Sequence, residues 1–359
     1  MRVLLAITAA LGITYLAGRG SAQQGRGGQQ QNNAEVHVMP VRGNVYMLVG
    51  AGGNITLSVG PDGVLMVDTG LANMTDKILA AVNRIEIEKA TNGVLVLHGG
   101  AEGRSSMRAD IDTPAPPKPI RYIINTHVHP DHVGGNGKIA KTGKTFTGGN
   151  VAGNLSDAGD GAAIFAHENV LNRLTATTPG QAPTPFGALP TDTYHTEGMY
   201  MSHFFNGEGV QLIHQPAAHT DGDTMVFFRY SDVLATGDIF VTTSYPIIDL
   251  ARGGSINGTI DALNHMLDIA VPEFRLEGGT YIIPGHGRLC DAADVAYYRD
   301  MTTIIRDRIQ DSIKKGMTLE QVKAAHPTSD YDGRYGATTG FWTTDAFVEA
   351  VFKSLTQKK

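Results

Sequence analysis

The chain has 359 residues, of which 42% are hydrophobic and 18% charged, with 44 glycines, 13 histidines and one cysteine. This length allows one large or two small domains, and the hydrophobic content excludes an intrinsically disordered protein. The single cysteine, Cys290, excludes an internal disulfide framework and a cysteine-based zinc cage. The formal net charge of -6 argues against a nucleic-acid-binding protein that relies on a basic surface.

The first 22 residues have the pattern of a secretory signal peptide. Arg2 precedes an apolar run from Val3 to Ala17, and the small residues of Gly20–Ala22 follow at positions suited to cleavage. The run is shorter than the ~20 residues of a membrane-spanning helix, which favours cleavage over a membrane anchor or a buried helix. We therefore expect a periplasmic or secreted protein with no stable membrane anchor after cleavage.

A Gln- and Gly-rich stretch, residues 23–34, follows the signal and predicts a flexible linker. Removal of the signal takes away Arg2 and Arg19 and no acid, so the net charge changes from 29 − 35 = −6 to 27 − 35 = −8. Residues 35–359 remain as the expected folded domain.

Strands with clear turn residues between them open this domain. Hydrophobic runs at 45–49, 55–59 and 64–67 are separated by Gly- and Pro-containing turns, which predicts an antiparallel meander. Helical periodicity predicts a helix at 75–89, and the Gly- and Pro-rich residues 91–119 predict an inserted loop.

The rest of the chain alternates between strand and helix patterns, and the order of the elements predicts two mixed sheets between outer helices in one domain. A long loop is expected at 177–208. The expected strands are 121–125, 162–166, 210–214, 224–230, 233–236 and 281–283, and the expected helices are 167–176, 256–270 and, in the C-terminal part 291–359, 295–313, 319–325 and 344–355.

Three histidines and one aspartate occupy six positions directly after the predicted strand 121–125. In an extended loop, residues two apart face the same way, so His127 and His129 can hold one metal ion while Asp131 and His132 face a second. Imidazole and carboxylate ligands suit Zn²⁺, with Fe and Mn as alternatives. The other interpretation is a capped turn with incidental histidines, although neutral imidazoles this close together are costly to bury without a partner.

Further candidate ligands follow other predicted strands. His219, Asp238 and His286 each lie in a loop that starts where a strand-like run ends, with Gly or Pro nearby. Taken singly, each residue type is more often found at a surface or in a cap. Together with the segment 127–132 they form a plausible ligand set.

These motifs, with Val67-Asp68-Thr69-Gly70, resemble those of the metallo-β-lactamase-fold hydrolases over about residues 36–290. The resemblance implies an αββα sandwich with two zinc ions in a cleft between the sheet edges, and a small-molecule substrate. It implies that His127, His129 and His219 bind the first metal, that Asp131, His132 and His286 bind the second, that Asp238 bridges them or completes the second site, and that Asp68 orients a ligand.

The resemblance also implies the reaction, in which a hydroxide bridging the two metals cleaves an ester, lactam or thioester bond. Asp131 and His132 are the expected catalytic residues, with Asp131 orienting the water. His129 stands where oxygen-reducing diiron members carry Glu. Asp238 stands where classical zinc β-lactamases carry Cys or a residue that binds no metal, whereas glyoxalase-II-like thioesterases carry Asp there.

Two other functions stay open at this point. An iron-dependent sulfur dioxygenase of the same fold would bind one iron through His127, His219 and Asp238. A non-catalytic zinc-binding protein would keep the ligands without turnover.

Four residues after Asp238 are candidates for substrate contact, because they follow a strand end that carries a ligand. Arg252 is suited to pair with a substrate carboxylate. For Ser255 and Asn257, the alternative is that they cap the helix that follows. The four candidates are Tyr245, Arg252, Ser255 and Asn257.

Overall fold

The computed structural model describes residues 34–100, 118–145, 161–176, 182–201, 204–270 and 279–357. The predicted signal peptide and all but the last residue of the predicted linker lie outside this part. Glu35–Lys359 forms one compact unit. Within the described residues, no helix is both long and apolar enough to span a membrane.

The first sheet has seven strands that lie side by side in chain order. Its first four strands are antiparallel, and the last four are joined by parallel pairings. The sequence did not predict the first strand, an edge strand in which Pro40 interrupts the apolar run and no residue is fully buried. The strands are β1 (His37–Arg42), β2 (Val45–Val49), β3 (Ile55–Gly60), β4 (Gly63–Val67), β5 (Ile120–Ile124), β6 (Ala163–His167) and β7 (Asp192–Tyr194).

The second sheet has five strands in the order β12-β11-β10-β9-β8. Only the pairing of β11 with β12 is parallel. The segment 177–208, expected to be a loop, contributes β7, β8 and a short 3₁₀ helix, η3 (Phe186–Ala188), to the described part of the fold. The strands are β8 (Gly198–Tyr200), β9 (Val210–Gln215), β10 (Asp223–Phe228), β11 (Val233–Ala235) and β12 (Tyr281–Ile283).

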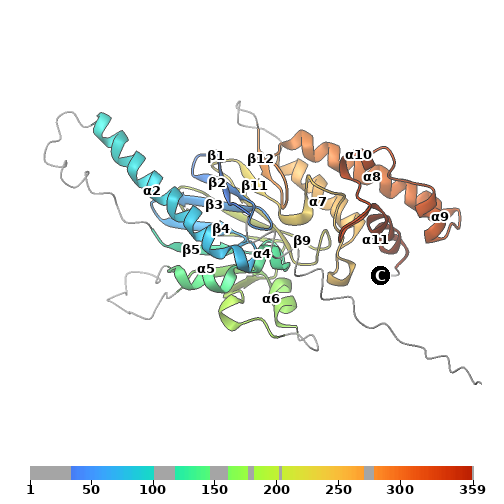
Figure 1. The fold of residues 1–359 in the computed structure, drawn as a ribbon, viewed down its shortest axis with the longest axis horizontal. Helices are drawn as coiled ribbons and strands as arrows, with labels where there is room; N and C mark the ends of the chain where they lie inside the picture. Colours follow the sequence, from blue (N-terminus) through green and yellow to red (C-terminus); the bar gives the residue numbers. More distant parts are fainter. Residues whose placement is uncertain are drawn as a thin grey trace, which may run out of the picture. The chain divides into compact units, whose positions relative to one another are not determined.

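The helices cover the outer faces of the two sheets, as Figure 1 shows. Helices α2, α5 and α6 contact strands of the first sheet, and α7, α8 and α11 pack together on the second. The predicted helix at 75–89 is confirmed but continues to Gly100, so the expected loop begins at least ten residues later; residues 101–117 lie outside the described part. The helices are α2 (Thr75–Gly100), α4 (Pro130–Val133), α5 (Asn136–Thr142), α6 (Glu168–Thr175), α7 (Ile256–Ile269), α8 (Ala292–Lys314), α9 (Leu319–Ala324), α10 (Asp332–Tyr335) and α11 (Thr344–Thr356).

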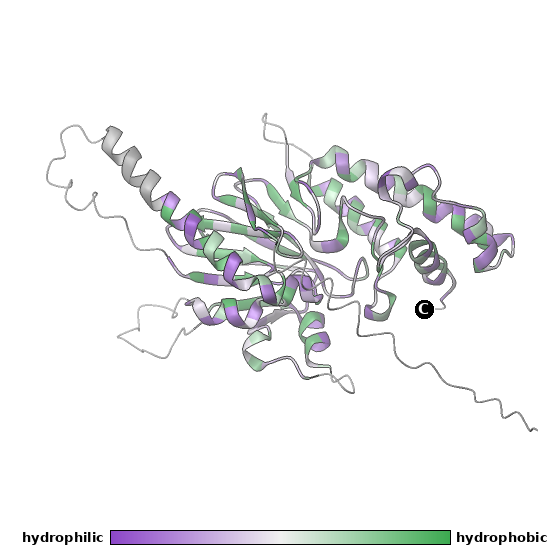
Figure 2. Ribbon diagram, in the orientation of Figure 1, coloured by the Kyte–Doolittle hydropathy of each residue, from purple (hydrophilic) through white to green (hydrophobic). Residues whose placement is uncertain are grey.

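Two buried layers follow from the alternation of side chains along the strands. Leu212 packs with residues of both sheets, whereas its neighbour Ile213 packs against the C-terminal helices. In Figure 2 the strands are mostly green and the helices alternate between purple and green, as this layering requires. The two mixed sheets between outer helices are therefore confirmed.

Candidate metal centre

The candidate ligands lie in loops at the ends of strands from both sheets. The segment 127–132 follows β5, with His129 at the N-cap of α4 and Pro130 in its first turn. His219 lies between β9 and β10, Asp238 lies in the 3₁₀ helix η4 (Gly237–Ile239) after β11, and His286 follows β12. Loops that meet at one edge of a sandwich bring residues distant in sequence together.

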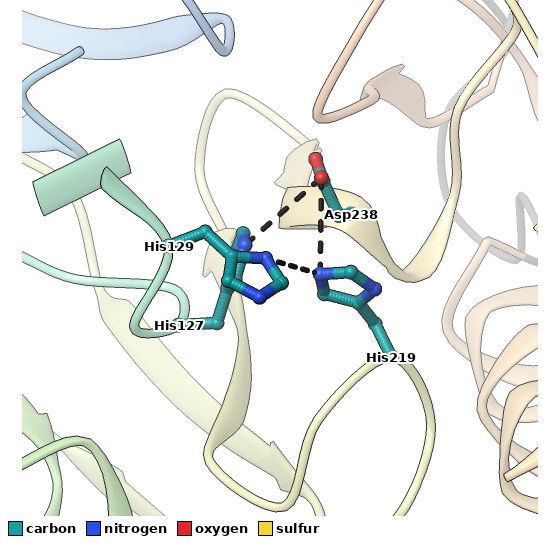
Figure 3. A group of neighbouring side chains, drawn as sticks. All are labelled: His127, His129, His219 and Asp238. Carbon is teal, nitrogen blue, oxygen red and sulfur yellow. Dashed lines mark hydrogen bonds and ion pairs between the residues drawn. The ribbon is translucent and has the colours of Figure 1, made fainter. Parts of the chain in front are cut away.

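The first cluster comprises His127, His129, His219 and Asp238, whose ligand atoms all lie within 4.8 Å of one another. Figure 3 shows His127 and His129, from the loop after β5, converging with His219 and Asp238, which come from two other loops. His129 Nδ1 lies 2.8 Å from His219 Nε2. Side chains this close together are positioned to share a single cation.

The second cluster comprises Asp131, His132 and His286, again with ligand atoms within 4.8 Å of one another. Asp131 Oδ2 lies 3.2 Å from His286 Nε2 and 3.8 Å from His132 Nε2. The side chain of His132 is fully buried, whereas that of Asp131 is 31% exposed. The second cluster therefore opens to solvent on the side of Asp131.

The carboxylate of Asp238 joins the two clusters. Its Oδ2 lies 4.0 Å from His127 Nε2 and 3.9 Å from His219 Nε2. Its Oδ1 lies 3.1 Å from His132 Nε2 and 3.4 Å from His286 Nε2. One oxygen thus faces each cluster, which is the arrangement expected of a bridging ligand.

The unsatisfied polar atoms of the centre fit metal ions. Among the described residues, the buried atoms His127 Nε2, His132 Nε2 and Asp238 Oδ1 make no hydrogen bond of acceptable geometry, although the last two lie 3.1 Å apart. Buried polar atoms without partners are costly, and imidazole nitrogen and carboxylate oxygen are donors that Zn²⁺ prefers. The donor set present in this chain therefore suits the ions that the family resemblance implies.

Asp68 holds one ligand in position, as the resemblance implied. Its Oδ2 lies 2.7 Å from His132 Nδ1, and the two carboxylate oxygens accept hydrogen bonds from the Thr126 backbone N–H and hydroxyl at 2.8 and 2.7 Å. The backbone of Asp68 is left-handed, with φ 65°. Contact with Asp68 fixes the tautomer of His132 so that its Nε2 faces the second cluster.

Sequence reasoning missed the partners of the other histidines. Asp249 Oδ2 lies 2.9 Å from His129 Nε2, and the Ile247 carbonyl oxygen lies 2.6 Å from His219 Nδ1. These contacts leave His129 Nδ1 and His219 Nε2 to face the first cluster. No spacing pattern distinguishes Asp249 from other surface acids, because it is brought to His129 only by the fold.

Burial lowers the pKa of two imidazoles in the first cluster, those of His127 and His219, and so keeps them neutral. Burial, with His132 close by, lowers the pKa of His127 well below its usual value. Burial also lowers the pKa of His219 to about 4. Neutral imidazoles have a free lone pair, which is the form that binds a metal ion.

The pKa values in the second cluster reflect its carboxylates. Burial opposes a charge on His286, but Asp238 and Asp131 raise its pKa to about 9. Burial likewise opposes ionisation of Asp238, but His132 and His286 hold its pKa well below the usual value. The carboxylates of this cluster therefore stay ionised, and their negative charge favours the binding of a cation between them.

Two glycines allow the loops to approach the centre. A side chain at Gly53 would place its Cβ 2.3 Å from the His132 ring, and one at Gly285 would place its Cβ 2.0 Å from Asp238 Oδ1. Both contacts are far shorter than van der Waals distance. Only glycine therefore fits at these two positions without displacing a ligand.

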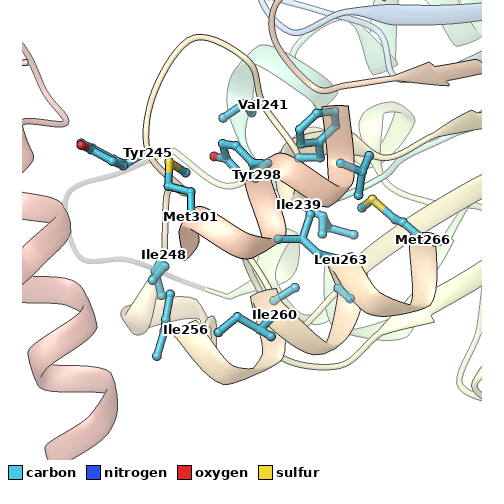
Figure 4. Packing of buried hydrophobic residues seen from close by; sticks show 14 of the residues in the cluster. Ile239, Val241, Tyr245, Ile248, Ile256, Ile260, Leu263, Met266, Tyr298 and Met301 are labelled. Carbon is cyan, nitrogen blue, oxygen red and sulfur yellow. The ribbon is translucent and has the colours of Figure 1, made fainter. Parts of the chain in front are cut away.

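The side chains of three candidate substrate contacts have partners outside the two ligand clusters. Tyr245 is buried in the C-terminal core that Figure 4 shows, stacked on Phe347, and its hydroxyl donates to Asp332 at 2.8 Å. Ser255 caps α7, and Asn257 accepts a hydrogen bond from Arg306. These placements correct the expectation for Tyr245, Ser255 and Asn257, whose side chains are committed to packing and capping.

Arg252 is the exception among these candidates, because it lies next to the centre. Its guanidinium donates to Asp249 Oδ2 at 2.6 Å, the same oxygen that contacts His129. Its side chain is 44% exposed. The structure thus gives Arg252 a partner within the protein. Asp249 lies between its guanidinium and the candidate ligand His129.

Comparison with known proteins places this architecture in a family. Residues 48–286 match the sequence profile of the metallo-beta-lactamase superfamily. No curated protein matches the chain.

Solved structures share the fold at low sequence identity. The sec-alkyl sulfatase Pisa1 from Pseudomonas sp. is 17% identical with a TM-score of 0.53, and 90% of this chain aligns with 51% of the sulfatase. A double mutant of the same sulfatase has a TM-score of 0.55 at 16% identity, with 91% and 51% of the two chains covered. The chain therefore spans about half the length of these sulfatase structures. A metallo-beta-lactamase from Pontibacter korlensis is 12% identical with a TM-score of 0.48, covering 75% of this chain and 99% of that one.

Proposed function

We propose that this chain, which belongs to the metallo-beta-lactamase superfamily, is a metal-dependent hydrolase that uses two zinc ions to cleave an ester, lactam or thioester bond in a small molecule. The placement of Asp238 carries the proposal. Its two carboxylate oxygens face two separate clusters of histidine and aspartate side chains. One bridging carboxylate between two ligand sets is what a two-metal hydrolytic centre needs.

The residues have distinct roles in this proposal. His127, His129 and His219 hold the first ion, and Asp131, His132 and His286 hold the second, with Asp238 between them. Bound zinc supplies a water of lowered pKa and polarises the bond to be cleaved. The partly exposed Asp131 carboxylate is the group suited to orient that water and to take its proton.

The presence of the second cluster argues against a dioxygenase that binds one iron ion. Such an enzyme would use His127, His219 and Asp238 alone. It would leave the buried Nε2 of His132 without a hydrogen bond among the described residues and give the second cluster no role. The same burial cost argues for a metal at both positions.

Metal content and turnover test the proposal together. We expect protein purified without added metal to hold two zinc ions per chain and to hydrolyse one member of a panel of esters, β-lactams, thioesters and, in view of the sulfatase fold relative, alkyl sulfates. His286→Ala should lose the second zinc and lower kcat/KM by about a hundredfold or more. The exposed His195 lies outside both clusters, so His195→Ala should keep both ions and full activity.

Other results would contradict the proposal in different ways. One iron per chain with oxygen uptake on a persulfide would identify a dioxygenase. Two bound zinc ions with no turnover across the panel would indicate a zinc-binding protein.

A further inference from the structure

A cavity of about 500 Å³ adjoins the candidate metal centre at His129. This volume falls within the range of small-molecule sites. Its walls come from the chain after Asp238 and from the C-terminal segment that ends in α11. We call it the C-terminal pocket, and its apolar lining residues include Ile247, Leu250, Phe341, Trp342, Ala346 and Ala350.

The charged side chains in the lining are paired with one another or with neighbours. Glu349 accepts from Lys353 at 2.6 Å and from Lys323 at 2.9 Å. Asp249 contacts His129 and Arg252. Since each charge already has a partner, the remaining surface of the pocket favours an uncharged apolar group.

The C-terminal wall is a feature of this chain rather than of the superfamily match. The match ends at residue 286, whereas Phe341, Trp342 and α11 come after it. Phe341 is 86% exposed although it is a large apolar residue. An exposed aromatic side chain at the mouth of an apolar cavity is typical of a surface that a ligand covers.

We propose that the C-terminal pocket binds an uncharged alkyl or aryl group of the substrate and so selects apolar substrates for the metal centre. This inference rests on the proposed hydrolytic function, because His129 links the pocket to the centre where the bond is cleaved. The apolar group would lie beside the scissile bond, and the part of the substrate that contacts the metals would reach past His129.

The single tryptophan of the chain gives a direct measurement of occupancy. Trp342 lines the pocket, and no other tryptophan contributes to the emission. Titration of the full chain with primary alcohols from butanol to decanol should shift the emission of Trp342. Each added methylene should lower Kd about three- to fourfold until the pocket is full.

Three variants separate the pocket from general surface binding. Ala346→Phe should fill the pocket and abolish the dependence of Kd on chain length. Phe341→Ala should weaken decanol binding about three- to tenfold. The control is Phe186→Ala, which removes a 91% exposed phenylalanine outside the pocket and should leave Kd unchanged.

A series of acyl esters with one leaving group connects the pocket to turnover. For wild type, kcat/KM should rise with the length of the acyl chain. Ala346→Phe should lower kcat/KM for the long esters and leave that for the acetyl ester unchanged. A Kd independent of chain length, or an equal loss in Phe186→Ala and Phe341→Ala, would overturn the pocket. If the alcohols bind as expected but no ester, β-lactam, thioester or alkyl sulfate is cleaved, the pocket stands and the hydrolytic proposal fails.

Discussion

At the scale of single residues, the centre depends on side chains that hold the ligands rather than on the ligands alone. His132 is held by Asp68, and His129 is held by Asp249. Burial opposes ionisation of Asp249, but His129 and Arg252 keep its pKa below the usual value, so it is a carboxylate at neutral pH. Each such contact fixes the tautomer and orientation of an imidazole before a metal arrives, which raises the affinity of the site.

Substitution of Asp249 tests this positioning role. We expect Asp249→Ala to weaken zinc binding at the first cluster about 10- to 100-fold, because His129 loses the partner of its Nε2. Arg252→Ala removes the other partner of the same carboxylate and should change the zinc Kd little, since exposed ion pairs contribute at most about 1 kcal/mol. Competition with a chromophoric chelator measures both constants, and equal values for Asp249→Ala and wild type would exclude the role.

At the scale of elements, the ligands follow strand ends and short helices, while the long helices stabilise the sandwich. Helix α2 is the longest that packs on the first sheet, and it carries an ionisable residue in an unfavourable place. Glu86 Oε1 is buried without a hydrogen-bond partner among the described residues. Burial raises the pKa of Glu86 to about 7, although the Lys118 backbone N–H partly offsets the effect.

The raised pKa of Glu86 predicts a pH-dependent stability. In the unfolded chain this carboxyl ionises near 4.5, so between pH 4.5 and 7 the folded state loses stability as pH rises. Glu86→Gln removes the penalty and should raise the free energy of unfolding by about 1–2 kcal/mol at pH 8. At pH 4, where both states are protonated, it should have little effect. Denaturant unfolding at the two pH values measures the difference, and a gain of equal size at both would contradict the assignment.

At the scale of the whole compact unit, the residues of the candidate metal centre come from both sheets. The segment 127–132 follows β5 of the first sheet, whereas His219, Asp238 and His286 follow strands of the second. Ions bound by all of these residues would hold the two sheets together at one edge. Because ligands that bind only the folded state stabilise it, the centre should contribute to stability as well as to catalysis.

Removal of metal tests this contribution. Free zinc a thousandfold above its Kd should stabilise the folded state by about 4 kcal/mol, and a chelator should reverse the effect. Thermal unfolding with and without chelator gives the change in Tm. In His132→Ala, which lacks a ligand of the second cluster, the chelator should lower Tm by less than in wild type. If the chelator leaves the Tm of wild type unchanged, metal binding at the centre does not stabilise the folded state.

The local patterns of the sequence were sufficient for most strands and helices. Periodicity and turn residues placed β2, β3 and β4 closely, because each reflects interactions between near neighbours along the chain. They missed β1, an edge strand that contains Pro40 and has no fully buried residue, and they ended α2 too early. The ligand set followed from residue chemistry and from the resemblance to a known family.

Only the tertiary structure decided what surrounds that ligand set. The contact of Asp249 with His129 spans 120 residues, and the C-terminal pocket joins His129 to residues after 340. The fold also placed Tyr245 in the core and Ser255 in a helix cap. Local sequence determines which residues can bind a metal, but orientation and burial depend on contacts between distant segments, which only packing creates.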